Sequence, residues 1–179
     1  MRLAVVCIAL SVVLVACSTQ PRVIDRSTGT VYSEYFENDS TVLDGALRLH
    51  TIITMGDERV PEDHVWPEVA RKRLQRNGDV FPIVLEVYAT NLSSEPIEIS
   101  FVSIEPKNKN RKFPTNGATI EPGEFTKSPP LIHTTSIYIP QVFDHFLEVN
   151  VDGERVVIEG EVQRLTVEEL EARAGKAAR

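Results

Sequence analysis

Residues 146–165, FLEVNVDGERVVIEGEVQRL, constrain the fold more than any other part of this 179-residue chain. Apolar and polar residues alternate on both sides of Asp152-Gly153. Alternation with a period of two is typical of a half-buried strand, and Asp-Gly favours a two-residue type I′ turn. The stretch therefore predicts an antiparallel hairpin, with Gly160 as a point where the second strand bends.

Other segments also have the pattern of strands. The ranges that we expect to form them are 31–36, 47–55, 81–90, 97–105 and 131–139. In 47–55 one face is formed by Leu47, Leu49, Thr51, Ile53 and Met55. The nearly continuous apolar run of 81–90 predicts a central strand that is buried on both sides or nearly so. In 97–105 the alternation changes phase at Val102, which predicts a β-bulge there.

One segment, 67–77, has the pattern of a helix. Pro67 suits the first helical position, and Asn77-Gly78 is a stop signal. Within the helix we expect Val69, Ala70 and Leu74 to share a face. A second short helix is expected from 166 to 174, because Thr166 and Glu169 have the spacing of a capping box.

About seven strands separated by turns predict a mainly β fold, an antiparallel β-sandwich with one or two short helices. Two turns support this reading: Asn91-Leu-Ser-Ser-Glu-Pro96 between strands, and Glu121-Pro-Gly-Glu124 before a late strand. In these features the stretch from Val80 to Ile139 resembles the immunoglobulin-like sandwiches of many bacterial envelope proteins. The resemblance implies an immunoglobulin-like sandwich domain over residues 31–165. The Cys–Trp–Cys framework of the antibody-type branch is absent.

The N-terminus has the features of a secretory signal. After Met1-Arg2, the run from Leu3 to Ala16 is apolar except for Ser11. It is shorter than the ~20 apolar residues that a membrane-spanning helix needs, and it fits the apolar core of a signal peptide.

The end of this run, Leu14-Val15-Ala16-Cys17, resembles the lipobox of bacterial lipoproteins. The resemblance implies that residues 1–16 are removed and that Cys17 becomes the lipidation site. Residues 17–30 are then the lipid anchor and a flexible tether, and residues 166–179 are a helix and tail. Ser18 is not the aspartate that retains such proteins in the inner membrane. We therefore expect the periplasmic side of the outer membrane, or the cell membrane of a one-membrane bacterium.

Processing at Cys17 would also fix the chemistry of the mature chain. Cys7 would leave with the signal and Cys17 would be acylated, so no disulfide and no thiol nucleophile would remain. Because Arg2 also leaves, the net charge of −7 becomes about −8. An acidic chain of this kind argues against a nucleic-acid partner.

We find no residue pattern that indicates an enzyme or a cofactor. Motifs of serine hydrolases, zinc proteases, P-loop proteins and dinucleotide-binding proteins are absent. The four histidines are His50, His64, His133 and His145. No two of them lie within five residues, so we expect solvated or hydrogen-bonded histidines and no metal centre. The 26 acidic residues make carboxylate pairs unavoidable and therefore uninformative.

A basic cluster, Arg71, Lys72, Arg73 and Arg76, is a candidate partner contact. It could meet an acidic protein or phospholipid headgroups. The alternative is structural, because cations near a helix C-terminus complement the helix dipole. Trp66 likewise has two readings, as an anchor onto the core or as a ligand platform.

These features together predict a non-enzymatic, lipid-anchored envelope module that binds another envelope protein or helps to assemble a complex. The alternative is an immunity or inhibitor lipoprotein that neutralises a toxin or a hydrolase in the periplasm. A small hydrolase or metalloenzyme is a third reading, for which the sequence contains no motif.

Overall fold

The computed structural model describes residues 34–56, 59–76, 80–106, 110–114, 116–136, 142–166 and 168–169. The predicted signal peptide, Cys17 and the tether lie outside the described residues, as do residues 31–33 and 170–179.

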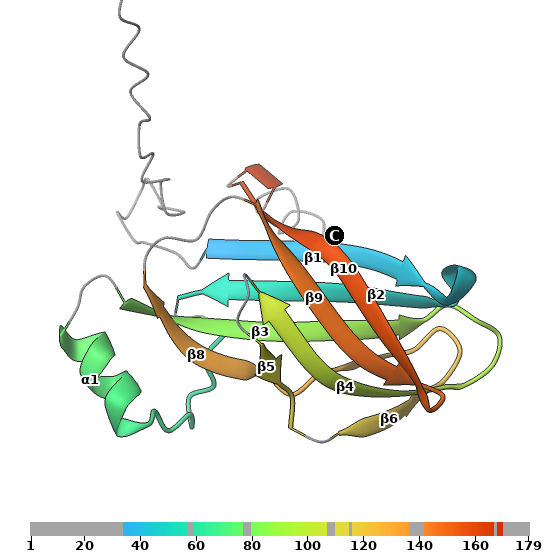
Figure 1. Ribbon diagram of the computed structural model, residues 1–179, viewed down its shortest axis with the longest axis horizontal. Coiled ribbons are helices and arrows are strands. Elements are labelled where there is room, and N and C mark those ends of the chain that lie inside the picture. Colours follow the sequence, from blue (N-terminus) through green and yellow to red (C-terminus); the bar gives the residue numbers. More distant parts are fainter. Residues whose placement is uncertain are drawn as a thin grey trace, which may run out of the picture.

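The described part of the chain is built mostly from strands (Figure 1). The strands are β1 (Glu34–Val42), β2 (Leu47–Met55), β3 (Val80–Asn91), β4 (Ile97–Pro106), β5 (Arg111–Lys112), β6 (Gly117–Ile120), β7 (Phe125–Lys127), β8 (Leu131–Ser136), β9 (Val142–Val151) and β10 (Glu154–Arg164). One α-helix, α1 (Glu68–Arg76), and a 3-10 turn, η1 (Leu43–Gly45), complete these elements. The expectation of a mainly β fold with one or two short helices is confirmed.

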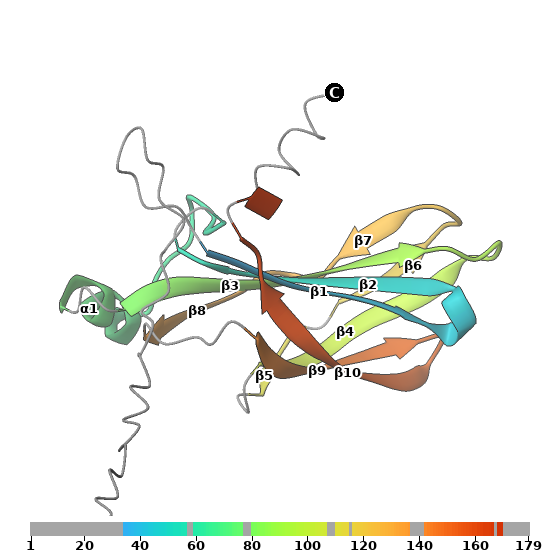
Figure 2. The same cartoon turned by 90° about the horizontal axis from the view of Figure 1, so that it is seen from above.

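All ten strands belong to one antiparallel sheet, in the order β5-β4-β9-β10-β1-β2-β3-β7, with β6 beside β4 and β8 beside β3. Figure 2 shows how this sheet forms a sandwich: β9 and β10 lie apart from β1, β2 and β3 for most of their length. They approach only where β10 ends beside β1, at the pairs Phe36↔Arg164 and Glu37↔Gln163. The antiparallel sandwich is therefore confirmed, and the immunoglobulin-like resemblance stays a prediction.

The core lies between the two layers of the sandwich, one with β9 and β10 and the other with β1, β2 and β3. Its buried apolar side chains come from both layers, and they include Leu47, Leu49, Val87, Phe101, Leu147 and Val149. The predicted inner face of β2 is confirmed, because all five of its residues are buried. The run 81–90 is indeed central: β3 pairs with β2 along one edge and with β7 and β8 along the other.

The predicted bulge in β4 is also present. Phe101 pairs with Val149, whereas Ser103 pairs with the next residue, Glu148, so Val102 is the extra residue. Both Phe101 and Ile104 are buried although three positions separate them. The bulge is what lets both side chains reach the core.

The hairpin at Asp152-Gly153 forms as the alternation predicts. Val151 pairs with Glu154, and φ is +50° at Asp152 and +82° at Gly153, as a type I′ turn requires. The turn is held against β4, because the Asp152 N–H donates to the Glu98 carbonyl at 2.8 Å. The Asp152 carboxylate in return accepts the Glu98 N–H at 2.9 Å.

Replacing Gly153 with valine is expected to lower the free energy of unfolding by more than ~1 kcal/mol, because a β-branched residue is strained at positive φ. Urea unfolding followed by circular dichroism measures the change. Asp152→Asn is the matched control: Asn-Gly also favours this turn, so its midpoint should stay near that of the parent. Equal unfolding of Gly153→Val and the parent would rule out strain at this turn.

The predicted turn at 91–96 is organised by Asn91, whose side chain is fully buried. Its Nδ2 donates to the carbonyls of Glu95 at 2.7 Å and Ile120 at 2.8 Å. Its Oδ1 accepts from the N–H and the hydroxyl of Ser93. One buried amide thus fixes the turn and ties it to β6. Its hydrogen bonds offset the cost of removing the amide from water.

The predicted capping box at the C-terminus is present as well. The Thr166 N–H donates to the Glu169 carboxylate at 2.7 Å, and the Glu169 N–H donates to the Thr166 hydroxyl at 3.2 Å. The rest of the predicted helix lies outside the described residues.

Candidate functional site

The basic cluster is presented by α1, which lies beside the ends of β3 and β8 (Figure 1). The four cations, Arg71, Lys72, Arg73 and Arg76, are all exposed. The helix begins one residue after Pro67, whose carbonyl accepts the Arg71 N–H at 2.9 Å. The expected surface helix is therefore present.

The charges of α1 are largely available to a partner. Lys72 forms an ion pair with Glu68, one turn earlier, at 2.5 Å. Among the described residues, no acidic side chain lies within ion-pair distance of Arg71, Arg73 or Arg76. Arg73 and Arg76 lie in the last turn, where they also complement the helix dipole.

One prediction about α1 is wrong. Ala70 and Leu74 are half-buried, as expected, but Val69 is 65% exposed and does not share their face. Val65, just before the helix, is 86% exposed. Two exposed apolar side chains therefore belong to the same segment as the cations. We call Val65, Val69, Arg71, Arg73 and Arg76 the α1 patch.

A polar anchor holds the start of the segment that leads to α1. Arg59 lies in the connection from β2 to α1, and its Nη1 donates to the Glu86 carboxylate at 2.6 Å and to the Tyr88 hydroxyl at 3.3 Å. Glu86 is only 6% exposed, and Lys127 Nζ lies 3.7 Å from its other oxygen. A buried carboxylate on a central strand thus holds this connection against the sheet.

The anchor favours the charged form of Arg59. Burial alone would lower the pKa of the guanidinium, but the hydrogen bonds to Glu86 and Tyr88 outweigh it and raise the pKa.

Further along the connection, the rings of His64 and Trp66 are in edge-to-face contact, with centroids 4.6 Å apart. Trp66 is half-buried there, so it is neither fully inserted into the core nor fully exposed as a platform.

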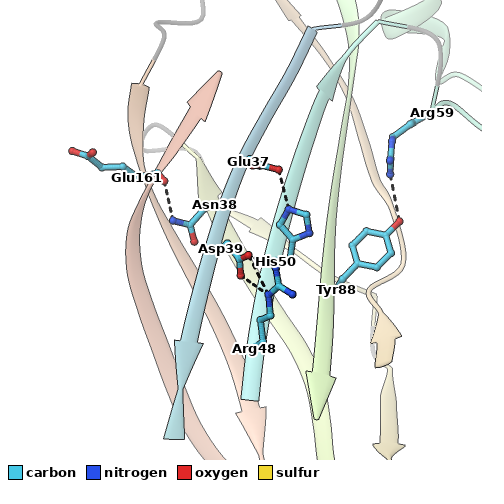
Figure 3. A network of polar contacts seen from close by, with 8 residues as sticks. All are labelled: Glu37, Asn38, Asp39, Arg48, His50, Arg59, Tyr88 and Glu161. Atoms are coloured by element: carbon cyan, nitrogen blue, oxygen red, sulfur yellow. Dashed lines mark hydrogen bonds and ion pairs between the residues drawn. The ribbon is translucent and has the colours of Figure 1, made fainter. Parts of the chain in front are cut away.

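The outer face of β1 and β2 carries a second polar group, which is already paired within itself (Figure 3). The Arg48 guanidinium makes a two-pronged contact with the Asp39 carboxylate, including an Nε bond of 2.8 Å. Beside it, His50 Nε2 lies 3.1 Å from the Glu37 carboxylate. Because these polar side chains pair with one another, this face is the ordinary polar surface of an antiparallel sheet.

The histidines are spread over the sandwich. His145 is 1% exposed, and its Nδ1 lies 3.1 Å from the Gly160 carbonyl. Burial lowers the pKa of His145, and burial with the nearby Arg111 charge lowers that of His133. Among the described residues, no three His, Cys, Asp or Glu side chains are grouped closely enough to hold a metal ion.

The structure does not test the lipid anchor. In the described part of the chain, no helix is long and apolar enough to cross a membrane.

Comparisons with known proteins do not assign a family. No family model matches the chain, and no curated protein matches it. Among solved structures, the X-ray structure of Northeast Structural Genomics Consortium target SoR45 is similar, with a TM-score of 0.37 and 11% sequence identity. The match covers 70% of this chain and 89% of that chain.

Proposed function

We propose that the chain is a non-enzymatic lipoprotein of the bacterial cell envelope. Cys17 holds it by lipid on the periplasmic side of the outer membrane, and residues 17–30 tether the sandwich domain. Support for this part comes from the apolar run that ends in Leu14-Val15-Ala16-Cys17. Two or more acyl chains give the stable anchoring that one chain does not.

The domain binds another envelope protein through the α1 patch. The observation that carries this proposal is the exposure of Arg71, Arg73 and Arg76, which have no ion-pair partner among the described residues, on a chain whose net charge is −7. Exposed cations suit an acidic partner, because complementary charge speeds encounter and selects the partner. The buried Arg59–Glu86 anchor keeps the patch in a fixed place, which lowers the entropy lost on binding.

Reversing Arg71 and Arg73 to glutamate should weaken partner recovery from envelope extracts by roughly tenfold. The loss should be larger at low salt, because salt screens exposed charges. Affinity pull-down at two salt concentrations measures it.

The matched control is the double variant Arg111→Glu, Lys112→Glu. It makes the same number of charge reversals on β5, which is not part of the α1 patch. The α1 variant should unfold near the parent, since exposed charges contribute well under ~1 kcal/mol each. Urea unfolding checks the control separately, because Arg111 is half-buried. Equal partner recovery from the two variants would mean that the basic cluster only complements the helix dipole and does not bind the partner.

Replacing Cys17 with serine should abolish lipid attachment, because serine provides no thiol to acylate. Mass spectrometry of the N-terminal peptide from the parent should show a diacylglyceryl-modified Cys17 as the first residue. In the variant this species should be absent, and the precursor with residues 1–16 should accumulate. An unmodified Cys17 in the parent, or cleavage elsewhere, would contradict the anchor and leave the α1 patch to be tested by the pull-down.

A further inference from the structure

Strand β10 has an open edge. It pairs with β9 from Glu154 to Gln163, but with β1 only at Gln163 and Arg164. The Asn38 side chain extends this seam slightly, by donating to the Glu161 carbonyl at 2.9 Å. From Glu154 to Gly160, no described strand pairs with the other edge of β10.

The geometry of the hairpin identifies the backbone groups on that edge. A two-residue turn makes Val151 and Glu154 a hydrogen-bonded pair, so even-numbered residues of β10 direct their N–H and C=O groups to β9. Arg155, Val157 and Glu159 therefore direct theirs to the open edge. The bond from Asn38 to the carbonyl of odd-numbered Glu161 agrees with this assignment.

The exposed side chains along this edge carry opposite charges on either side of an apolar centre. Arg155 and Glu159 stand two residues on either side of Val157, which is 49% exposed. Charges usually protect an edge strand from pairing with another chain. Here the order positive, apolar, negative is complementary to itself when a second identical strand runs antiparallel.

We propose that β10 is a contact between two copies of this chain, which pair antiparallel about a twofold axis at Val157. Each Arg155 then faces Glu159 of the other copy, and opposite charges directly across two strands are favourable. Arg155 also binds Glu148 of its own β9, through Nε at 2.7 Å and Nη2 at 3.1 Å. Its five donors allow it to bridge both carboxylates.

The contact is of the self-complementary kind found in twofold dimers. It is small, so the dimer is weak in solution. If the lipid anchor of the proposed function holds, two copies on one membrane meet at a high effective concentration, which favours pairing. The dimer contact itself does not depend on the anchor and is testable in solution.

Site-specific cross-linking tests the pairing. Val157→Cys in the purified mature chain, treated with a short bis-maleimide over a range of protein concentrations, should give a covalent dimer. Val142→Cys is the matched control, because Val142 is also an exposed valine (44%) but lies on β9, away from the open edge. The parent, treated in the same way, reports any reaction of Cys17. Dimer yields that are equal for the two cysteine variants would overturn the proposal.

Charge reversal tests the register. In the Val157→Cys background, Glu159→Arg and Arg155→Glu should each reduce the dimer yield roughly tenfold, because like charges then face each other twice per dimer. Mixing these two variants should restore the yield as a heterodimer, in which each pair is again complementary. Tags of different length distinguish the three products.

Thermal unfolding shows whether Arg155→Glu, which also loses its bond to Glu148, remains folded. Glu159→Arg removes no such ion pair with β9, so its dimer yield can be interpreted without the unfolding measurement. Equal yields from all combinations would mean random collision or another register, and would overturn the proposal. Cross-linking of Val157→Cys only to a different protein in extracts would also overturn it, in favour of strand addition by that protein.

Discussion

Replacing Gly160 with alanine is expected to lower the free energy of unfolding by about 2–3 kcal/mol. A Cβ atom at this position would stand 2.9 Å from Asn38 Nδ2 and 3.2 Å from His145 Cε1. Neither neighbour can move aside easily. Asn38 is held by its bond to the Glu161 carbonyl, and the buried His145 ring is held by its contact with the Gly160 carbonyl. The added methyl group would therefore open the seam between β1 and β10. Urea unfolding measures the loss.

Gly117→Ala is the control for this variant. Gly117 lies on the short strand β6, and a Cβ there would have its nearest neighbour 3.9 Å away. Its stability should be unchanged or slightly higher, because alanine restricts the unfolded chain. Asn38→Ser should recover part of the loss when it is combined with Gly160→Ala, since it shortens the side chain that the methyl group meets. Additive effects of the two changes would argue against the contact.

The sequence predicts the parts of the fold in which local pattern and tertiary environment agree. In β2 the inner residues are apolar or small and all are buried, so alternation identifies the strand. In the β9–β10 hairpin the turn chemistry of Asp152-Gly153 adds a second signal at the same place. The bulge at Val102 is predictable because it leaves a visible break of phase between Phe101 and Ile104.

The parts that the sequence does not predict are those where inner positions are polar. We predicted a strand that ends at Phe36, but β1 continues to Val42. Asn38 lies on the same face as the buried Phe36, and it uses its side chain to bind β10. The alternation is lost there because the edge of a sandwich places polar side chains where hydrogen bonds, not apolar packing, join the layers. The short strands β5, β6 and β7 carry too few residues for any period to be visible.

The candidate site also has a part that the sequence predicts and a part that it does not. The four cations of α1 lie within six consecutive residues, 71–76, so their clustering needs no tertiary information. The anchor on the segment before α1 joins Arg59 to Glu86, which are 27 residues apart, and no local pattern links the two. A single glutamate inside an otherwise apolar strand is the one signal that could have identified it, because a buried carboxylate needs a cationic partner. Val69 was misplaced because α1 contacts the sheet through a narrow strip, and apolar residues outside that strip remain exposed.

Replacing Glu86 with alanine is expected to destabilise the domain by about 2–3 kcal/mol and to release the connection that positions α1. The change leaves Arg59 half-buried without its carboxylate, and it leaves Lys127 without its ion-pair partner. The value lies at the low end for a buried ion pair, because the Arg59 side chain is 32% exposed and can turn toward water. Urea unfolding measures the global loss, and hydrogen exchange measures the local one, which should be largest at residues 59–76.

Two controls separate the buried anchor from surface charge. Asp39→Ala breaks the exposed ion pair with Arg48, and it should cost under ~1 kcal/mol without faster exchange in α1. Glu86→Gln keeps the shape and an acceptor oxygen but removes the charge, so it should fall between the alanine variant and the parent. If the anchor fixes the α1 patch for its partner, Glu86→Ala also weakens partner recovery at a temperature where the domain is still folded. That result would show that binding depends on the position of the cations as well as on their charge. Slow exchange in α1 of Glu86→Ala would instead show that packing against β3 and β8 holds the helix, with Arg59–Glu86 contributing only to the stability of the sheet.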